Sequence, residues 1–434
     1  MCAVVLTGRA AAAVLLGVAA IAWRPSTGTV LLWALGVVVL VAVDLALAPS
    51  PRTLVLERSV SPLVRLGEAA RSDLLVTNPG RRGVRGQVRD AWQPSAGAEE
   101  DRHPLRLRSG DRVRLTTRLL PTRRGDRHAD LVTVRLRGPL GLAARQTSVA
   151  VPGTVRVLHP FHSRRHLPAK LSRLRQIDGR SAVRRRGQGT EFDSLRDYVE
   201  GDDVRSIDWR ATARRGSVVV RTWQPEQHRR IVIVVDTSRT SAGRVGDVPR
   251  LDAAMDATLL LTALAGHAHD RVDVIAGDQR VRVRVIGSAD RANPLAEVVS
   301  ALAPIEPAIV EADWSALAAA VVSRHHQRSL VVLLTPLEPA AIEEGLLPVV
   351  PALVARHRVV LASVADPAVG DLLAERSTTT AVYAAAAAER TIARRHSVAA
   401  ALERMGVDVI DAEADELPAR LADHYLWLKS EGLL

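Results

Sequence analysis

The sequence predicts a multidomain chain with two N-terminal transmembrane helices, an all-β immunoglobulin-like sandwich and a doubly wound α/β domain. Three observations predict it: two long apolar runs at the start, short alternating segments between turn residues in the middle, and apolar strands alternating with helical patterns towards the end. With 434 residues, 47% of them hydrophobic, the chain is long enough for two or three cores. We place the boundaries at 1–50, 51–160, 161–228 and 229–434.

The composition argues against a nucleic-acid partner despite a formal net charge of +12 and a sequence pI near 11.0. Lys170 and Lys429 are the only lysines, so arginine carries almost all of the excess, as a biased genome composition would produce in a chain so rich in Ala and Val. Aromatic residues are only 3% of the chain, which leaves few side chains for stacking on bases. The single cysteine, Cys2, excludes an intramolecular disulfide framework and a cysteine-based metal site.

The two apolar runs, Ala10–Trp23 and Val30–Leu47, predict a helical hairpin in a membrane. The second run is long enough to span a bilayer, whereas the first needs part of Met1–Arg9 to reach about 20 residues. A signal peptide is the alternative for the first run, although the second run follows it closely. Asp44 lies near the end of the second run, where an interfacial carboxylate costs little, so we predict no special role for it.

The arginines around the hairpin predict its orientation. Arg9 precedes it, Arg52, Arg58 and Arg65 follow it, and Arg24 alone lies in the turn. We therefore expect both ends of the hairpin in the cytoplasm and the short turn outside.

Residues 51–160 carry short alternating segments separated by turn signals, the pattern of a sandwich. His103, His128 and His159 are scattered singly among them, and we expect them at the surface. The predicted strands are Thr53–Arg58, Ala70–Thr77, Val84–Arg89, Val113–Leu119, Ala129–Leu136 and Thr154–Leu158.

The segment 161–186 is a basic connector with a helical pattern around Leu167–Leu174. A solvated linker helix is the simpler interpretation, and contact with anionic lipid is the alternative.

The stretch Arg184–Trp223 is polar but dense in capping signals. Thr190 and Asp193 resemble a capping box, and Phe192, Leu195, Tyr198 and Val199 would then form the apolar stripe of a first short helix. Asp202 and Asp203 start a second helix that Gly216 ends, before a strand at Ser217–Trp223. Ile207 and Trp209 are predicted anchors against the α/β domain, which makes the stretch a structural brace; Trp209→Ala would then cost about 3–5 kcal/mol.

This stretch resembles the bacterial family called domain of unknown function 58. The matching motifs are Gly-x-Gly-x-Glu-Phe, Leu-Arg-x-Tyr, Gly-Asp and Arg-x-Ile-Asp-Trp. In this chain their residues are Gly187, Gly189, Glu191, Phe192, Leu195, Arg196, Tyr198, Gly201, Asp202, Arg205, Ile207, Asp208 and Trp209. The resemblance implies a two-pass protein of the bacterial inner (cytoplasmic) membrane with a von Willebrand factor A-like domain, whose partner is a MoxR-type AAA+ ATPase in chaperone-like or envelope-assembly work.

After Arg229 strands and helices alternate, which predicts a mainly parallel sheet whose ligands bind beyond the carboxyl ends of Ile231–Val235 and Leu330–Leu334. The other predicted strands are Val272–Ala276, Val281–Ile286, Val359–Val364 and Val407–Ile410. The predicted helices are Leu251–His267, Pro294–Leu302, Trp314–His325, Ile342–Arg356, Ala384–Met405 and Glu416–Leu428.

The resemblance implies a Mg²⁺ or Mn²⁺ site made of Asp-x-Ser-x-Ser, a Thr from a second loop and an Asp from a third. This chain has Asp236, Ser238 and Thr240, oxygen ligands that suit such cations. The second-loop position falls near Ala312, beside Asp313 and Ser315, and the third-loop Asp is replaced by Pro336. Glu338 is a candidate to reach the same region. We therefore expect a degenerate site with weak cation affinity.

Three function classes compete. The first is an anchored protein-interaction or scaffold module, because the sequence has no P-loop and its Gly-x-Gly lacks the strand context of a dinucleotide site. The second is a metal-dependent hydrolase built from Asp202, Asp203, Asp208 and Asp236, although a pair of carboxylates at a helix start is more simply a cap. The third is binding of nucleic acid or anionic lipid by the basic connector. We favour the first.

Overall fold

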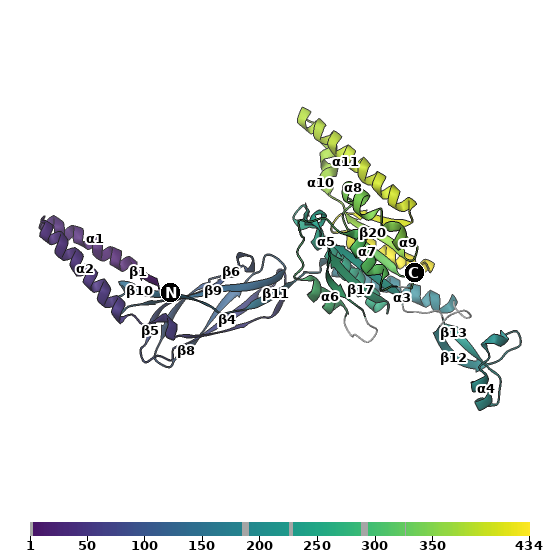
Figure 1. Cartoon of the computed structure of the whole chain (residues 1–434), viewed down its shortest axis with the longest axis horizontal. Helices are drawn as coiled ribbons and strands as arrows, with labels where there is room; N and C mark the ends of the chain where they lie inside the picture. Colours follow the sequence, from purple (N-terminus) through teal and green to yellow (C-terminus); the bar gives the residue numbers. More distant parts are fainter. Residues whose placement is uncertain (1–2, 185–190, 225–228, 288–293, 326) are drawn as a thin grey trace. The chain divides into compact units, whose positions relative to one another are not determined.

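The computed structural model describes residues 3–184, 191–224, 229–287, 294–325 and 327–434 (Figure 1). The chain divides into two compact units, Met1–Pro160 and Phe161–Leu434. The first unit is rich in β-strands and the second is mixed α/β, so the multidomain α/β expectation is confirmed at that level.

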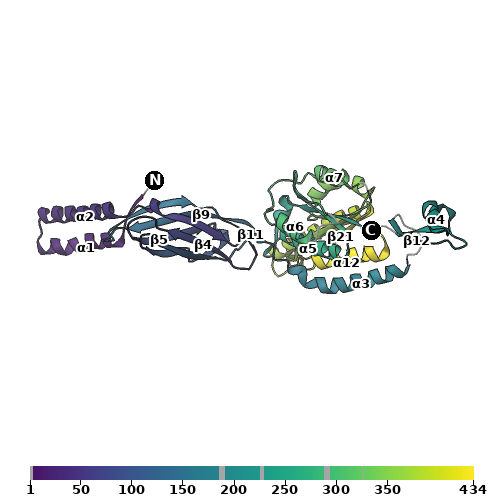
Figure 2. The ribbon, with the colours of Figure 1, turned by 90° about the horizontal axis from the view of Figure 1, so that it is seen from below.

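Two antiparallel helices, α1 (Gly8–Trp23) and α2 (Thr27–Leu47), lie side by side (Figures 1 and 2). Ser26 caps α2 by accepting a hydrogen bond from the Thr29 N–H at 3.1 Å. Trp33 of α2 donates its indole N–H to the Ala13 carbonyl at 3.1 Å and packs over Gly17, where a Cβ would lie 2.4 Å from the ring. The turn between the apolar runs is therefore where the sequence predicts it.

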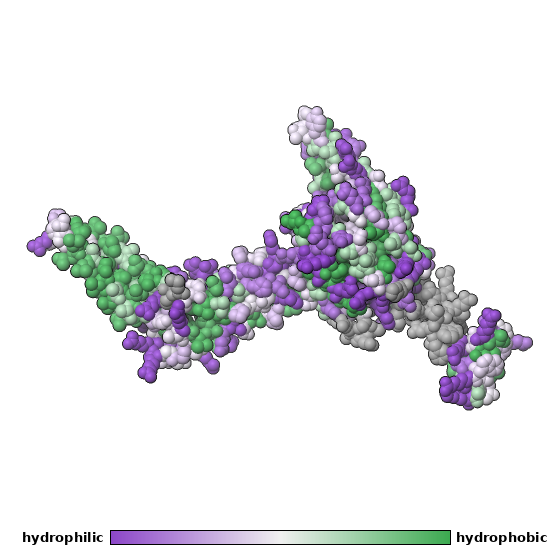
Figure 3. Space-filling view, viewed as in Figure 1, coloured by the Kyte–Doolittle hydropathy of each residue, from purple (hydrophilic) through white to green (hydrophobic). Residues whose placement is uncertain are grey.

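The segment before α1 is a strand rather than a helical extension, which corrects one expectation. β1 (Ala3–Leu6) pairs antiparallel with β10 (Ala143–Ala150) of the sandwich. Helix α1 therefore has only 16 residues, a length of about 24 Å, less than the roughly 30 Å of a bilayer core. By length and composition, α2 alone among the described helices is long and apolar enough to cross a membrane, and only 6% of that span is buried. Figure 3 shows the helix pair as a continuous apolar surface.

The rest of the first unit consists of two sheets that enclose a common core, which includes the side chains of Leu74, Val88, Leu105, Leu115 and Val134. One sheet contains β1, β10, β9 (Gly125–Arg137), β11 (Thr154–Leu158), β3 (Leu63–Arg65), β5 (Val84–Trp92) and β7 (Arg102–Leu107). The other contains β2 (Val55–Val60), β4 (Ala70–Thr77), β8 (Arg112–Leu119) and β6 (Ala98–Glu99).

All six strands predicted here are found, but β3, β6, β7 and β10 were missed. Pro104 interrupts the pattern of β7, and β10 has polar residues on its outer face. One other expectation is wrong, because His159 is only 7% exposed. Arg58, one of the arginines that follow the hairpin, lies inside the sandwich. Its guanidinium is buried against Asp90 at 2.6 Å, and Asp90 also accepts from Ser72 at 3.2 Å.

Asp44 has a structural role that the sequence analysis did not predict. Its carboxylate is fully buried and accepts backbone N–H groups from Leu140 (2.7 Å), Leu142 (2.7 Å) and Ala143 (2.8 Å). A Cβ at Gly138 would lie 2.2 Å from the same carboxylate, so only glycine fits there. The end of α2 is thus fastened to the turn between β9 and β10.

The second unit is built on a six-stranded sheet of order β18-β17-β14-β19-β20-β21, parallel except for the edge strand β18. Its strands coincide with the six predicted. They are β14 (Arg230–Asp236), β17 (Arg271–Gly277), β18 (Val281–Val285), β19 (Leu330–Leu334), β20 (Arg358–Val364) and β21 (Val407–Ala412).

Helices cover both faces of this sheet (Figure 2). One face is covered by α5 (Arg250–His267), α6 (Pro294–Leu302) and α12 (Leu417–Glu431), and the other by α7 (Trp314–Val322), α9 (Val350–Val354) and α11 (Thr379–Arg404). The predicted helix at 342–356 is broken into a π-helical turn, Ile342–Leu346, and α9. Two shorter helices, α8 (Pro339–Ala341) and α10 (Pro367–Ala374), follow β19 and β20, and a small hairpin, β15 (Arg244–Val245) and β16 (Val248–Pro249), precedes α5.

The basic connector forms helix α3 (Leu167–Arg184), which packs on α12 and α5 rather than standing as a solvated linker. Leu174 is 3% exposed, and Lys170 forms an ion pair with Asp423 of α12 at 2.7 Å. Just before α3, the Ser163 N–H donates to the buried Asp256 of α5 at 2.9 Å. These contacts make the connector part of the α/β unit.

Candidate functional site

The strand order of the second unit places a crevice at the carboxyl ends of β14 and β19. Numbered along the chain, the order is 3-2-1-4-5-6, so the first and fourth strands are neighbours whose connections leave in opposite directions. Ligands of open α/β sheets bind at such a switch point. The described chain has a cavity of about 210 Å³ there.

Asp236, the last residue of β14, is the centre of this crevice and is 1% exposed. One carboxylate oxygen accepts hydroxyls from Thr240 (3.0 Å) and Thr335 (2.7 Å), and the other accepts the Ser238 N–H at 2.7 Å. The Ser238 and Thr240 hydroxyls lie 3.1 Å apart. The structure thus brings together the three predicted residues, Asp236, Ser238 and Thr240, in one hydrogen-bonded network.

Thr335 is the residue of this network that the sequence analysis missed. It lies immediately after β19, one position before Pro336, where the resemblance implies an acidic ligand. Its hydroxyl is buried and donates directly to Asp236. The sequence signal that could have identified Thr335 is a hydroxyl residue directly after β19, the strand that lies beside β14 at the switch point.

The other predicted neighbours contribute less. Ala312 lines the cavity, but Asp313 turns to cap α7 by accepting the Ala316 N–H at 2.9 Å, and Ser315 is exposed. Glu338 accepts from Arg250 at 2.9 Å and is not among the residues that line the cavity. It therefore does not serve as a replacement ligand.

The rim of the crevice is charged and exposed. Arg239 and Glu311 form an ion pair there, and hydrogen bonding to Glu311 raises the pKa of Arg239. Glu344 also lines the cavity. The crevice is thus a buried polar floor under a rim that carries both signs of charge.

These residues do not form a complete site for a divalent cation. A hard cation takes about six oxygen ligands and favours several carboxylates, whereas the buried floor has one carboxylate and three hydroxyls that already bond to one another. Among the described residues no group of three or more His, Cys, Asp or Glu side chains is placed to hold a metal ion.

The motif-rich stretch forms a separate two-stranded sheet, and its predicted first helix is wrong. β12 (Glu191–Asp197) pairs antiparallel with β13 (Val219–Gln224), so Leu195 and Arg196 lie on a strand. The second helix is present as a 3-10 turn, Val204–Ser206, followed by α4 (Trp209–Arg215), and Gly216 ends it at φ 74°. Gly187 and Gly189 lie outside the described residues, and for Glu191 and Phe192 the backbone alone is described.

The carboxylates of this stretch have local structural partners. Asp208 caps α4 through the Arg210 and Ala211 N–H groups at 3.0 Å and pairs with Arg221 at 2.8 Å; the Ala211 N–H and Arg221 lower its pKa. Asp202 pairs with Arg196 at 2.5 Å, which lowers its pKa. The hydrolase alternative needs Asp202, Asp203, Asp208 and Asp236 to share one ion, and the described residues give no such grouping.

Trp209 is not a buried anchor, which corrects the expectation of a brace. Its side chain is 68% exposed. Three apolar or aromatic residues of the same stretch are exposed as well: Tyr198, Val199 and Val204. Neither Gly201 nor Ile207 is buried. Within the described chain, β12, β13 and α4 pack chiefly on one another, and Arg205 is exposed on the turn between them.

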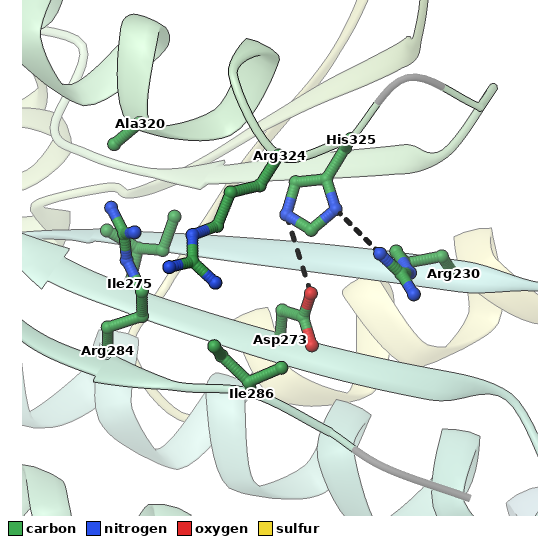
Figure 4. A pocket seen from close by; sticks show the side chains of 8 residues that line it. All are labelled: Arg230, Asp273, Ile275, Arg284, Ile286, Ala320, Arg324 and His325. Carbon is green, nitrogen blue, oxygen red and sulfur yellow. Dashed lines mark hydrogen bonds and ion pairs between the residues drawn. The ribbon is translucent and has the colours of Figure 1, made fainter.

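A second cavity, of about 120 Å³, lies near the amino end of β14 and has charged side chains in its wall (Figure 4). His325 lies between Asp273, 3.4 Å from its Nε2, and the Arg230 guanidinium, 3.1 Å from its Nδ1. Burial lowers the pKa of His325, and the positive charges of Arg230, Arg284 and Arg324 lower it further. The negative charge of Asp273 acts in the opposite direction and raises this pKa. The neutral ring then accepts at Nδ1 from Arg230 and donates at Nε2 to Asp273.

Comparison with known proteins supports the family resemblance. The model of the family described as protein of unknown function DUF58 matches residues 194–404, just under half of the chain. A solved structure, the CARDB domain of the PF1109 protein from Pyrococcus furiosus in complex with di-metal ions, matches with 18% identity and a TM-score of 0.18. That match covers 24% of this chain and 91% of that one, and its TM-score is too low to bear on the fold. No curated protein matches the chain.

Proposed function

We propose that this chain is a membrane-anchored protein-interaction module whose partner binds the crevice at the carboxyl ends of β14 and β19. The observation that carries the proposal is the network at Asp236. A single buried carboxylate holds Ser238, Thr240 and Thr335 from two loops in one arrangement. Such pre-ordering lowers the entropy cost of binding a partner surface.

The lining of the crevice favours binding over catalysis. Its described lining residues include no His, Lys or Cys, so no neutral base lies beside the Ser238 and Thr240 hydroxyls. The Thr240 hydroxyl donates to the Asp236 carboxylate, and the Ser238 hydroxyl lies 3.1 Å from that of Thr240. The exposed Arg239 and Glu311 on the rim suit charge-complementary contact with a protein.

We further propose that residues 229–434 form a von Willebrand factor A-like domain and that the partner is a MoxR-type AAA+ ATPase. The strand order and the Asp236-x-Ser238-x-Thr240 sequence support the first point, and the family resemblance is the ground for the second. A cation at Asp236 would need a further carboxylate, and an acidic residue of the partner is our candidate for it.

The proposed anchor is a two-pass hairpin in the bacterial cytoplasmic membrane with both folded units in the cytoplasm. Strand β1 precedes α1 and β10 follows α2, yet the two strands pair with each other. Both ends of the helix pair therefore lie on one side, which supports a second crossing through α1 despite its short length. The basic residues near the hairpin ends favour the cytoplasmic side.

Capture of the candidate ATPase by variants of the full chain tests the proposed function. Asp236→Ala and Thr335→Val should each weaken capture by tenfold or more, because both changes release the loops of the crevice. Asp247→Ala, which removes an exposed carboxylate from the β15–β16 turn, is the matched control and should capture normally. Unchanged capture by the Asp236 variant would move the interaction surface elsewhere, most simply to the sandwich.

Calorimetry with Mg²⁺ and Mn²⁺ tests the incomplete site separately. The chain alone should give no saturable binding up to about 1 mM cation, because one carboxylate is too few for a tight site. Tight binding in the absence of a partner would contradict the incomplete-site interpretation.

A further inference from the structure

The first unit has a large arginine-lined cavity at the point where helix α2 ends. It measures about 690 Å³, and Leu47 and Pro49 at the end of α2 form part of its wall. The remaining wall comes from the ends of β5, β7 and β9 and the turns beside them. Five arginines line it: Arg82, Arg85, Arg106, Arg108 and Arg137.

Strand pairing places three of these arginines abreast. Arg85 of β5 lies directly opposite Arg106 of β7, and Leu136 of β9 lies opposite Gly86, which brings Arg137 next to Arg85. Val84, Leu107 and Leu136 point into the core, whereas the three arginines are exposed, so they share the outer face of the sheet. Like charges directly opposite each other in a sheet are destabilising unless something neutralises them.

The described residues of the protein do not neutralise them. None of the five guanidiniums makes a hydrogen bond or ion pair with any residue that the structure describes. Asp111 is the single acidic residue of the wall, and its carboxylate accepts the Arg108 backbone N–H at 3.2 Å. The cavity therefore has a large excess of positive charge and room for an anion.

The position of the cavity identifies the anion. Leu47 is the last exposed apolar residue of α2. Figure 3 shows that hydrophilic surface follows the apolar surface of the helix pair where the sandwich begins. The Asp44 hydrogen bonds to the turn between β9 and β10 hold Gly138 and Pro139, which also line the cavity, against the end of the helix. In a membrane that α2 spans, the cavity would lie at the depth of the lipid phosphates.

We propose that this arginine cavity binds the phosphate headgroup of an anionic phospholipid on the side of the membrane where the folded units lie. The inference rests on the proposed function in one respect, that α2 crosses the membrane. Guanidinium groups bind phosphate oxygens in a bidentate fashion, and three neighbouring forks on rigid strands form a fixed receptor for them. The lipid supplies the counter-charge that the protein lacks and fixes the sandwich at the membrane surface.

The test uses the full chain in neutral detergent, with bound lipid counted by native mass spectrometry. The probes are short-chain phosphatidylglycerol, short-chain phosphatidylcholine and inorganic phosphate. Wild type should bind phosphatidylglycerol at least tenfold more tightly than phosphatidylcholine. The affinity of the R85Q/R106Q/R137Q variant for phosphatidylglycerol should be about 100-fold lower than that of wild type. This value follows because each arginine contributes about 1 kcal/mol at an anionic surface.

Two further variants control for folding and for general charge. R85K/R106K/R137K keeps the charges but loses the bidentate forks, so its affinity should lie between those of wild type and R85Q/R106Q/R137Q. R71Q/R112Q/R114Q removes three exposed arginines from the other sheet, outside the cavity, and should bind as wild type does. Wild-type affinity in R85Q/R106Q/R137Q, or equal loss in the control triple, would overturn the proposal. Displacement of the lipid by equimolar inorganic phosphate would also overturn it, because the site would then bind free anions.

Carbonate extraction of membranes distinguishes failure of the headgroup proposal from failure of the proposed membrane anchor. Release of wild type would overturn the membrane anchor, and with it the headgroup site. Retention in the membrane together with no lipid selectivity would overturn the headgroup site alone.

Discussion

The aspartates of this chain differ in role according to the donors that surround them. Asp44 and Asp236 are buried, and each accepts three hydrogen bonds from groups distant in the sequence or across a turn. Asp202 and Asp208 accept from N–H groups and arginines within their own short stretch. The first pair joins separate elements, and the second pair shapes a local turn.

Replacing Asp44 should loosen the joint between α2 and the sandwich. Asp44→Ala leaves one buried and two partly buried N–H groups without their acceptor, so we expect the first unit to lose about 3 kcal/mol of unfolding free energy. The measurement is thermal unfolding of the full chain in detergent. Asp130→Ala, an exposed carboxylate on β9, should change stability by less than about 0.5 kcal/mol. Equal stability of the two variants would show that the joint is not needed for folding.

Two buried histidines should make the α/β unit sensitive to mild acid. Burial lowers the pKa of both His325 and His357, below the unfolded value of about 6.5. As the pH falls through 6.5 the unfolded chain takes up protons that the folded chain does not, so unfolding free energy decreases. The loss is at most about 1.4 kcal/mol per pH unit for each histidine.

His357→Phe provides the test, because both ring nitrogens of His357 are buried without a hydrogen-bond partner in the described chain. Between pH 7 and pH 5 its melting temperature should fall less than that of wild type. His396→Phe, at an exposed position on α11, should follow the wild-type slope. A wild-type slope in the His357 variant would show that this ring is not responsible.

At the scale of elements, the local sequence pattern predicted a helix where the structure has strand β12 of the β12–β13 sheet. Phe192, Leu195, Tyr198 and Val199 have the spacing of a helical stripe, but Leu195 pairs with Arg221 across a hairpin. Pairing with a partner strand that follows some 20 residues later satisfies the backbone better than a short isolated helix, which is marginal in water. The caps at Asp208 and Gly216 were found because capping depends on the nearest residues alone.

The exposure of Trp209 changes the expected effect of its removal. Trp209→Ala should cost less than about 1 kcal/mol, rather than the 3–5 kcal/mol of a packed anchor, because its side chain is 68% exposed. Val220→Ala, at a position that is 3% exposed on β13, should cost more. Hydrogen exchange of the β12–β13 amides provides the measurement. A loss of protection in the Trp209 variant as large as in the Val220 variant would restore the anchor role.

At the scale of the whole molecule, the pairing of β1 with β10 constrains how the chain can meet a membrane. It brings the chain on both sides of the helix pair into one sheet, so an arrangement that places them on opposite sides would break four residue pairs. A cleaved signal peptide would also remove an edge strand. The proposed hairpin keeps this pairing.

Cysteine labelling of intact cells tests that topology. With Cys2→Ser as background, Pro25→Cys in the turn between the helices should react with a membrane-impermeant maleimide added from outside. Glu68→Cys, on a sandwich turn, should react only after the cells are opened. Labelling of the sandwich position in intact cells would reverse the proposed orientation.

The sequence by itself determined the features that depend on near neighbours. The apolar runs, the alternation of strands and helices after Arg229 and the Asp236-x-Ser238-x-Thr240 loop were all predicted, since periodicity and turn chemistry act over a few residues. The tertiary structure decided which distant groups meet. Thr335 reaches Asp236, and the Ala143 N–H reaches Asp44, each across 99 positions of chain. Spacing in a sequence does not encode such pairs, because they depend on which strand ends and turns the fold places side by side.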